Sequence, residues 1–215
     1  MSLACQCGRA RGFSLVETLV ALIVICVGLL GIAKMQALAL SNMTTSRLRA
    51  LAAFEAAGLA AAMHSNRAYW ANTPANFTVT VNPAATPTIA SSDATLSGDA
   101  SADYAAGPSA GNGATGLNAC VGTAGGGAQC ATPVTLAAYD LARWAYSLGG
   151  PTVGLLPNPT ASISCPNIAG STLPTSCTIQ ITWTEQAVSI NNQEAANVGA
   201  GGQFETPTYL LYVEP

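Results

Sequence analysis

Gly12, Phe13 and Glu17 are the residues near the N-terminus whose types and spacing suggest chemistry. Glu17 opens an apolar run in which no residue from Leu19 to Ala33 is charged. An ionised group inside a bilayer costs at least ~3 kcal/mol by insertion scales, so this carboxylate needs a partner or a purpose. Cleavage between Gly12 and Phe13 would supply one, because it frees an ammonium group one helical turn before Glu17 on the same face.

The apolar run is long enough to position these groups in a membrane. Residues 13–33 would extend over about 31 Å as a helix, which crosses a bilayer hydrocarbon core. The amine on Phe13 and the carboxylate on Glu17 could then neutralise each other within one chain. Alternatively, Glu17 of one subunit could accept the amine of its neighbour, which would set an axial register and build a filament.

The N-terminal residues resemble the signature of the type IV pilin family. Arg9 and Arg11 match its short basic leader, Gly12 the residue before the cut, Phe13 the new N-methylated terminus, and Glu17 the assembly carboxylate at the fifth position of the mature chain. The resemblance implies a prepilin peptidase as processing partner. It also implies an α+β, type IV pilin-like fold, in which a long N-terminal helix packs on an antiparallel sheet. An ordinary signal anchor with a stray acid is the alternative.

Four segments are expected along the chain: a cleaved leader at 1–12, a transmembrane half-helix at 13–33, an amphipathic spine half at 34–70, and a periplasmic globular domain with two disulfides at 71–215. Basic residues before the apolar span keep the leader cytoplasmic and send the C-terminal domain across the inner membrane. The small share of charged residues and the abundance of Ala, Gly, Ser and Thr suit an exported protein.

Beyond Lys34 the helical pattern continues, and no proline occurs before Pro74. One helix is expected from Phe13 to about Met63. Its apolar stripe is expected to pack on the globular domain, and its charged residues are expected to face water. The stripe comprises Met35, Leu38, Met43, Leu48, Leu51, Phe54, Leu59, Ala62 and Met63, and the charged set comprises Arg47, Arg49, Glu55 and Arg67.

The exported domain holds four cysteines, which favour disulfides in an oxidising compartment. Three pairings are possible, and two short loops are the simplest: Cys120 with Cys130, and Cys165 with Cys177. A zinc site made of all four thiolates is the alternative, but it lacks any closely spaced pair. Cys26 lies in the apolar span and is expected to be a small filler.

Residues 82–131 are rich in Ala, Gly, Ser, Thr and Pro, and this composition predicts loops. The glycine motif at 111–116 has neither a preceding strand nor a following helix, so a dinucleotide site is not expected. Asp93, Asp99 and Asp103 are expected to be solvated acids on a loop. A calcium site is the alternative, but no EF-hand spacing supports it.

Outside that region the periodicity is clear. Alternation predicts strands at 77–81, 161–165, 178–184 and 208–213, and one polar face on each strand suggests an antiparallel sheet. Thr132 and Pro133 should start a second, short helix, which Gly149, Gly150 and Pro151 end. Residues 132–185 resemble the PilV-type minor pilins in their helix, cysteines and Trp183-bearing strand.

Composition and residue spacing also argue against several classes of function. Residues 72–215 hold one base, Arg143, against eight carboxylates, so binding of nucleic acid is not expected. The single histidine, His64, has no catalytic partners in sequence, and Trp144 and Trp183 lie on apolar faces that predict core packing. Neither catalysis nor a cofactor is expected.

The resemblance therefore implies a minor pilin in the bacterial inner membrane and the pilus fibre. Its partners would be other minor pilins, the major pilin and a tip adhesin, and it would support adhesion or twitching motility. A minor pseudopilin of the type II secretion system, which shares the N-terminal signature, is the alternative. A tethered binding module that never assembles would leave the Phe13 and Glu17 arrangement without a purpose.

Overall fold

A computed structural model describes residues 12, 14–74, 76–83, 88–107, 120, 130, 132–151, 154–166, 175–186 and 204–215. The chain divides into two compact units, Met1–Thr44 and Thr45–Pro215. The first unit contributes the start of a long helix. The second contains the remainder of that helix, the other helices and all strands.

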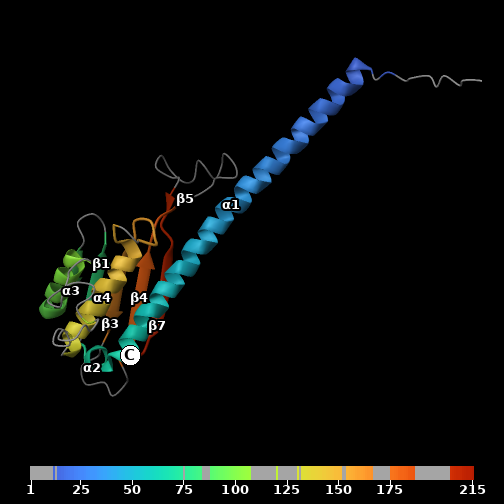
Figure 1. Cartoon of the computed structure of the whole chain (residues 1–215). Helices are drawn as coiled ribbons and strands as arrows, with labels where there is room; N and C mark the ends of the chain where they lie inside the picture. The colour runs from blue at the N-terminus through green and yellow to red at the C-terminus, as the bar shows by residue number, and fades with distance from the viewer. Residues whose placement is uncertain are drawn as a thin grey trace, which may run out of the picture. The chain divides into compact units, whose positions relative to one another are not determined.

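The long helix is α1, Leu15–Ser65 (Figure 1). Its first part is apolar all round, and no described side chain of residues 15–44 is buried. This stretch is long and apolar enough to cross a membrane. Gly28 and Gly31 lie within it without interrupting the helix. From Ala52 onward the helix has a buried face, made of Ala52, Glu55, Ala56, Leu59, Ala60 and Met63.

Two details of that buried face contradict the sequence prediction. Phe54 was expected to pack on the domain, yet its side chain is 73% exposed. Glu55 was expected to face water, yet only 7% of it is exposed. The helix is therefore rotated relative to its most hydrophobic stripe, because the domain pairs Glu55 with polar groups that lie far away in sequence.

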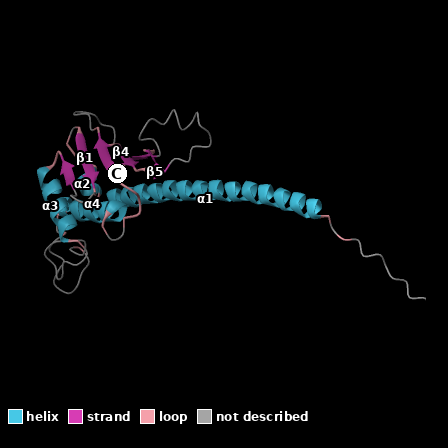
Figure 2. Cartoon of the chain, turned by 90° about the horizontal axis from the view of Figure 1, so that it is seen from above, coloured by secondary structure: helices cyan, strands magenta, loops and turns pink. Residues whose placement is uncertain are grey.

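Five strands form one antiparallel sheet in the order β2-β1-β3-β4-β7. Their bounds are β1 Phe77–Asn82, β2 Thr88–Ser91, β3 Thr160–Cys165, β4 Cys177–Thr182 and β7 Thr208–Val213. The strands β5, Glu185–Gln186, and β6, Phe204–Glu205, pair separately. Helices cover one face of the five-stranded sheet, as the view in Figure 2 shows. The predicted α+β class and antiparallel pairing are confirmed.

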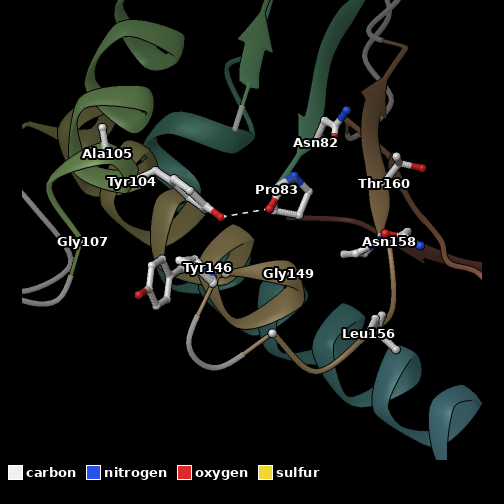
Figure 3. Close-up of a pocket in the computed structure, with 14 residues that line it drawn as sticks. Asn82, Pro83, Tyr104, Ala105, Gly107, Tyr146, Gly149, Leu156, Asn158 and Thr160 are labelled. Atoms are coloured by element: carbon white, nitrogen blue, oxygen red, sulfur yellow. Dashed lines mark hydrogen bonds between the residues drawn. The ribbon is translucent and has the colours of Figure 1, made fainter. Parts of the chain in front are cut away.

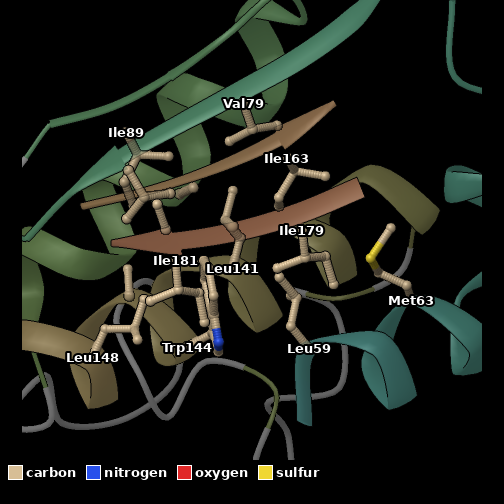
Figure 4. Packing of buried hydrophobic residues seen from close by; sticks show 14 of the residues in the cluster. Leu59, Met63, Val79, Ile89, Leu141, Trp144, Leu148, Ile163, Ile179 and Ile181 are labelled. Carbon is tan, nitrogen blue, oxygen red and sulfur yellow. The ribbon is translucent and has the colours of Figure 1, made fainter. Parts of the chain in front are cut away.

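The core lies between that face and the helices (Figure 4). Ile163, Ile179 and Ile181 project from the central strands and are fully buried. Leu59 and Met63 of α1 and Leu141 and Trp144 of α4 meet them, as do further members of the same cluster. Buried and exposed residues alternate along β1, β3 and β4, so the opposite face of the sheet carries the polar residues.

The second helix predicted from sequence is α4, Pro133–Gly149. Thr132 caps it, and Thr135 returns the bond to form a capping box, while the proline occupies the first turn. The predicted apolar face is buried: Ala137, Leu141, Trp144, Ala145 and Leu148. Trp183 is also buried, so the packing role predicted for Trp144 and Trp183 is confirmed.

The prediction of loops after Asn82 was wrong for residues 88–106. This stretch forms β2 and the helix α3, Ala94–Ala106, which packs on α4 and β2. Asp93 caps α3 through bonds from the backbone N–H groups of Thr95 and Leu96. Asp103, predicted to be solvated, is buried in the helix. A short helix, α2, Arg67–Trp70, follows α1 and was also not predicted.

Cysteine pairs close two segments of the second unit. Cys165 at the end of β3 is bonded to Cys177 at the start of β4, and both residues are fully buried. Cys120 is bonded to Cys130. Cys26 is free and exposed. The glycine motif at 111–116 lies outside the described residues.

Candidate functional site

The N-terminal segment contains the residues expected to be processed. Gly12 is exposed and precedes any regular structure, while Phe13 and residues 1–11 lie outside the described residues. The helix starts on the carbonyl oxygen of Ser14, which accepts bonds from the backbone nitrogens of Glu17, at 3.0 Å, and Thr18, at 3.3 Å. Gly12 is thus outside the helix and exposed to solvent.

Glu17 lies in the first turn of α1 and is exposed. An acid in that position interacts favourably with the unpaired N–H groups of the helix N-terminus. Among the described residues the one ion pair joins Arg49 and Glu185, so no described cation is paired with Glu17. The Glu17 carboxylate is therefore available to pair with an amine. That amine could lie one turn earlier on the same chain, or it could belong to another chain.

The described residues around Glu17 offer no other charge to balance it. Lys34 is the next charged residue of α1, and it follows Glu17 by nearly five turns. The side chains between them are exposed and apolar, among them Leu19, Val24 and Leu30. Such a surface is far larger than the apolar patches that soluble monomers tolerate, so lipid or other helices must cover it.

Two buried carboxylates hold the second part of α1 to the domain, and the sequence prediction missed both. The first is Glu55, whose Oε2 accepts a 2.7 Å bond from the hydroxyl of Ser147 on α4. The backbone carbonyl of the same residue accepts a 3.0 Å bond from the indole Nε1 of Trp144. Burial raises the pKa of the Glu55 carboxyl, and the bond from Ser147 opposes that rise.

The second is Glu185, which is only 4% exposed. Its Oε1 accepts a 2.9 Å bond from the indole of Trp183, and its Oε2 lies 3.4 Å from the guanidinium Nη2 of Arg49 on α1. Asn66 adds a third contact, since its amide donates to the carbonyl of Pro133 at 2.8 Å. Together these bonds fasten the C-terminal part of α1 to α4 and to β5.

The titratable side chains in the described part of the chain form no cluster of the kind that binds a metal ion. His64 is exposed at the end of α1. No described group of three or more His, Cys, Asp or Glu side chains could hold a metal ion. Asp93 instead accepts a 2.9 Å bond from the Tyr69 hydroxyl. The pKa of Tyr69 is raised, mainly because the ring is buried and to a smaller extent because of this contact with Asp93.

The comparison with known families falls on the N-terminal segment. A family model for the prokaryotic N-terminal methylation motif matches residues 7–33. The match covers the Gly12–Phe13 junction, Glu17 and the uncharged apolar run. No curated protein and no solved structure matches the chain significantly. The motif is of the prepilin type, and it supports a type IV pilin or a pseudopilin anchored in a membrane by α1.

Proposed function

We propose that this chain is a minor type IV pilin, a non-catalytic subunit that helps to initiate pilus assembly and enters or caps the filament. The observation that carries the proposal is the methylation motif at 7–33, with Glu17 in the first turn of a helix whose stretch from Leu19 to Ala33 is exposed and uncharged. Residues 1–12 are its leader, 13–33 its membrane-spanning part, 34–70 its spine, and 71–215 its periplasmic domain.

Processing is the first step of the proposed mechanism. A prepilin peptidase cuts after Gly12, and the freed amine of Phe13 is methylated. The new ammonium stands four residues before Glu17, about 6 Å along a helix axis. In the membrane, the ammonium of Phe13 and the carboxylate of Glu17 on the same chain can neutralise each other. In a filament, Glu17 accepts the amine of a neighbouring subunit, and this pairing fixes the axial position of each subunit.

The domain's task is to present a folded surface along or at the tip of the filament. The bonds from Arg49, Glu55 and Asn66 hold the C-terminal end of the long helix to α4 and β5. Other minor pilins, the major pilin and a tip adhesin are the proposed partners, and adhesion or twitching motility is the proposed output. The positive charges of the leader keep the leader cytoplasmic, so the domain lies in the periplasm.

Processing can be tested by the intact mass of the protein isolated from its native membrane. We expect a chain that begins at Phe13 and carries one added methyl group. A chain that retains residues 1–12 in a host with an active prepilin peptidase contradicts the proposal. Gly12→Glu is the matched variant, because a large charged residue before the cut should leave the leader in place.

The role of Glu17 can be tested by Glu17→Val. The change removes a charge from the membrane span, so insertion should become easier, while an amine left unpaired among packed helices should cost several kcal/mol. We therefore expect normal amounts of the variant in membranes and almost none in sheared filaments. Glu17→Asp keeps the charge and should retain part of the incorporation. Wild-type amounts of Glu17→Val in filaments would defeat the proposed pairing.

The type II secretion pseudopilin is the second candidate, because it carries the same N-terminal motif. Deleting the gene separates the two functions. Loss of surface pili with normal protein secretion is expected for the minor pilin. Loss of secreted enzymes with normal piliation would assign the chain to the secretion system instead.

A further inference from the structure

We propose that the domain binds a neutral oligosaccharide in a continuous site formed by a cavity at one end of the sheet and a shallow hollow on the sheet's open face. The inference does not depend on filament assembly. It rests on residues 80–182, all of which lie in the second compact unit.

The cavity has a volume of about 1000 Å³ (Figure 3). It lies where α3 and α4 end, beside the last residues of β1 and the chain that leads into β3. Tyr104 and Tyr146 line it with ring centroids 5.6 Å apart, and the Tyr104 hydroxyl is fixed by a 3.3 Å bond to the carbonyl of Pro83. Ligand cavities in proteins are commonly of this size and have aromatic walls.

Glycine and proline make up much of the remaining wall, and they keep it bare of longer side chains. A Cβ atom on Gly149 would lie 2.6 Å from the ring of Pro159 and 2.8 Å from that of Pro83. A larger residue there would therefore disturb the wall. The cavity thus presents apolar ring surfaces and backbone groups, with amide and hydroxyl side chains at its rim from Asn82, Asn158 and Thr160.

The hollow on the sheet has a volume of about 300 Å³. Its floor is formed by outward-facing residues of neighbouring strands. Thr80 of β1 is opposite Ser162 of β3, which is opposite Gln180 of β4. In the next row Thr160 is opposite Thr182. Adjacent strands lie about 4.8 Å apart, so the hydroxyl and amide groups form a closely spaced array.

The cavity and the hollow share two lining residues. Asn82, at the end of β1, and Thr160, at the start of β3, belong to both, and both are exposed. A ligand can therefore lie across them, with one end in the tyrosine-lined cavity and the other along Gln180 and Thr182. A chain of linked units could therefore occupy both parts at once, whereas a single small molecule would occupy one of them.

Its chemistry identifies the ligand class. None of the described residues that line either part is charged. Phosphates, acidic peptides and lipid headgroups would find no counter-ion there. Hydroxyl and amide groups both donate and accept hydrogen bonds, which matches the hydroxyl groups of a sugar, while the apolar part of the cavity wall suits the apolar face of a pyranose. A neutral, polyhydroxylated chain satisfies both features.

A peptide partner fits less well. β1, β3 and β4 are each paired on both sides, so their backbone groups are already used and no strand can be added under the hollow. Recognition there must go through side chains. Those side chains are short and uncharged, and they suit hydroxyl groups better than the apolar anchors of a docked peptide.

The test uses the full chain in a zwitterionic detergent, because a sugar headgroup would compete. The probes are neutral hexasaccharides of glucose, galactose, mannose and N-acetylglucosamine, titrated by calorimetry. We expect at least one of them to bind. Thr160→Val and Gln180→Val each remove one polar group at an exposed strand position and should weaken binding about tenfold. Ala105→Trp, at the exposed end of α3, should fill the cavity and do the same.

Thr178→Val is the matched control, because Thr178 lies on β4 and on the same face but outside the hollow. Its affinity should equal that of the unmodified chain. Tryptophan fluorescence of every variant checks that the domain is folded. Absence of binding by all four hexasaccharides overturns the proposal. So does equal affinity of Thr160→Val, Gln180→Val and Ala105→Trp with the unmodified chain, or tighter binding of a sialylated oligosaccharide or a peptide at this face.

Discussion

Replacing Asp140 on α4 by asparagine should stabilise the domain at neutral pH. Burial raises the pKa of the Asp140 carboxyl from its ordinary value of 3.8 to about 6, and the positive charge of Arg143 only partly opposes the rise. The guanidinium of Arg143 instead contacts the Tyr139 hydroxyl, at 3.2 Å. Among described residues no cation lies within ion-pair distance of Asp140.

The size of the effect follows from the change in pKa. A rise of about two units corresponds to about 3 kcal/mol between the folded and unfolded states. Since Asp140 is only partly buried, solvent screens the charge, and about 1–2 kcal/mol is a realistic expectation. Because the pKa is raised in the folded state, the cost is present in full above about pH 6 and is lost as the pH falls toward 3.8.

The measurement is urea unfolding of the full chain in detergent at pH 7.5 and pH 4.5, followed by tryptophan fluorescence. The three tryptophans, Trp70, Trp144 and Trp183, all lie in the second compact unit and are buried, so they report on that unit. We expect Asp140→Asn to exceed the unmodified chain in free energy of unfolding at pH 7.5, and the gap to shrink at pH 4.5.

Glu55 also contributes to the pH dependence of stability, because burial raises its pKa. Comparing Asp140→Asn with the unmodified chain at each pH removes this contribution, since both proteins contain Glu55. Glu214→Gln, at an exposed position near the C-terminus, controls for the change in net charge. If Asp140→Asn is less stable at pH 7.5, or if its advantage is the same at both pH values, burial of the Asp140 charge does not have the assigned cost.

Two further stability predictions use the same unfolding assay. Replacing Cys165 and Cys177 together by alanine removes the disulfide that closes a loop with a sequence separation of 12, and it should lower the free energy of unfolding by about 3 kcal/mol. Cys26→Ala, at a free cysteine, should leave the free energy of unfolding unchanged. Equal stability of the two variants and the unmodified chain would contradict the loop-closure argument. Glu185→Ala leaves the indole N–H of the buried Trp183 without its acceptor and should lower the free energy of unfolding by about 1–3 kcal/mol. Glu185→Gln should lower it less. An equal loss of stability in both variants would show that the charge of Glu185, not its hydrogen bond, matters.

Strong local periodicity explains which elements could be predicted from sequence. The whole of α4 and the strands around Ile163, Ile179 and Leu211 repeat at the period of their structure, and the start of α1 is an uninterrupted apolar run. The N-terminal motif is also local, since its residues are neighbours in sequence. These features need no knowledge of the rest of the chain.

Helix α3 could not be found that way because Gly98, two serines and two aspartates, which are weak helix formers, are interspersed among its alanines. Its stability comes from contacts: Leu96, Ala100 and Tyr104 are spaced by one turn and buried against α4 and β2. The spacing of these three residues, with Asp93 as the N-cap, was the signal in the sequence that could have indicated a helix. It was overlooked because the surrounding residues have a composition typical of loops.

Long-range pairing explains the errors on α1. Ser147, the partner of Glu55, lies 92 residues later in the chain, so no local pattern could place that carboxylate inside. Once Glu55 and Ala56 turn inward, Phe54 must turn outward. The oligosaccharide site has the same origin, because residues of three strands meet only after the sheet has formed.

The bond between Cys165 and Cys177 also has a mechanical consequence. A filament subunit under tension extends by the length of chain that unfolding releases. The disulfide joins the two ends of the β3–β4 connection, with 12 residues of separation across it, so about 40 Å of contour stays locked even when the sheet has been pulled apart. A stretched domain would therefore keep its two central strands tethered, and it would regain their pairing quickly when the pull ends.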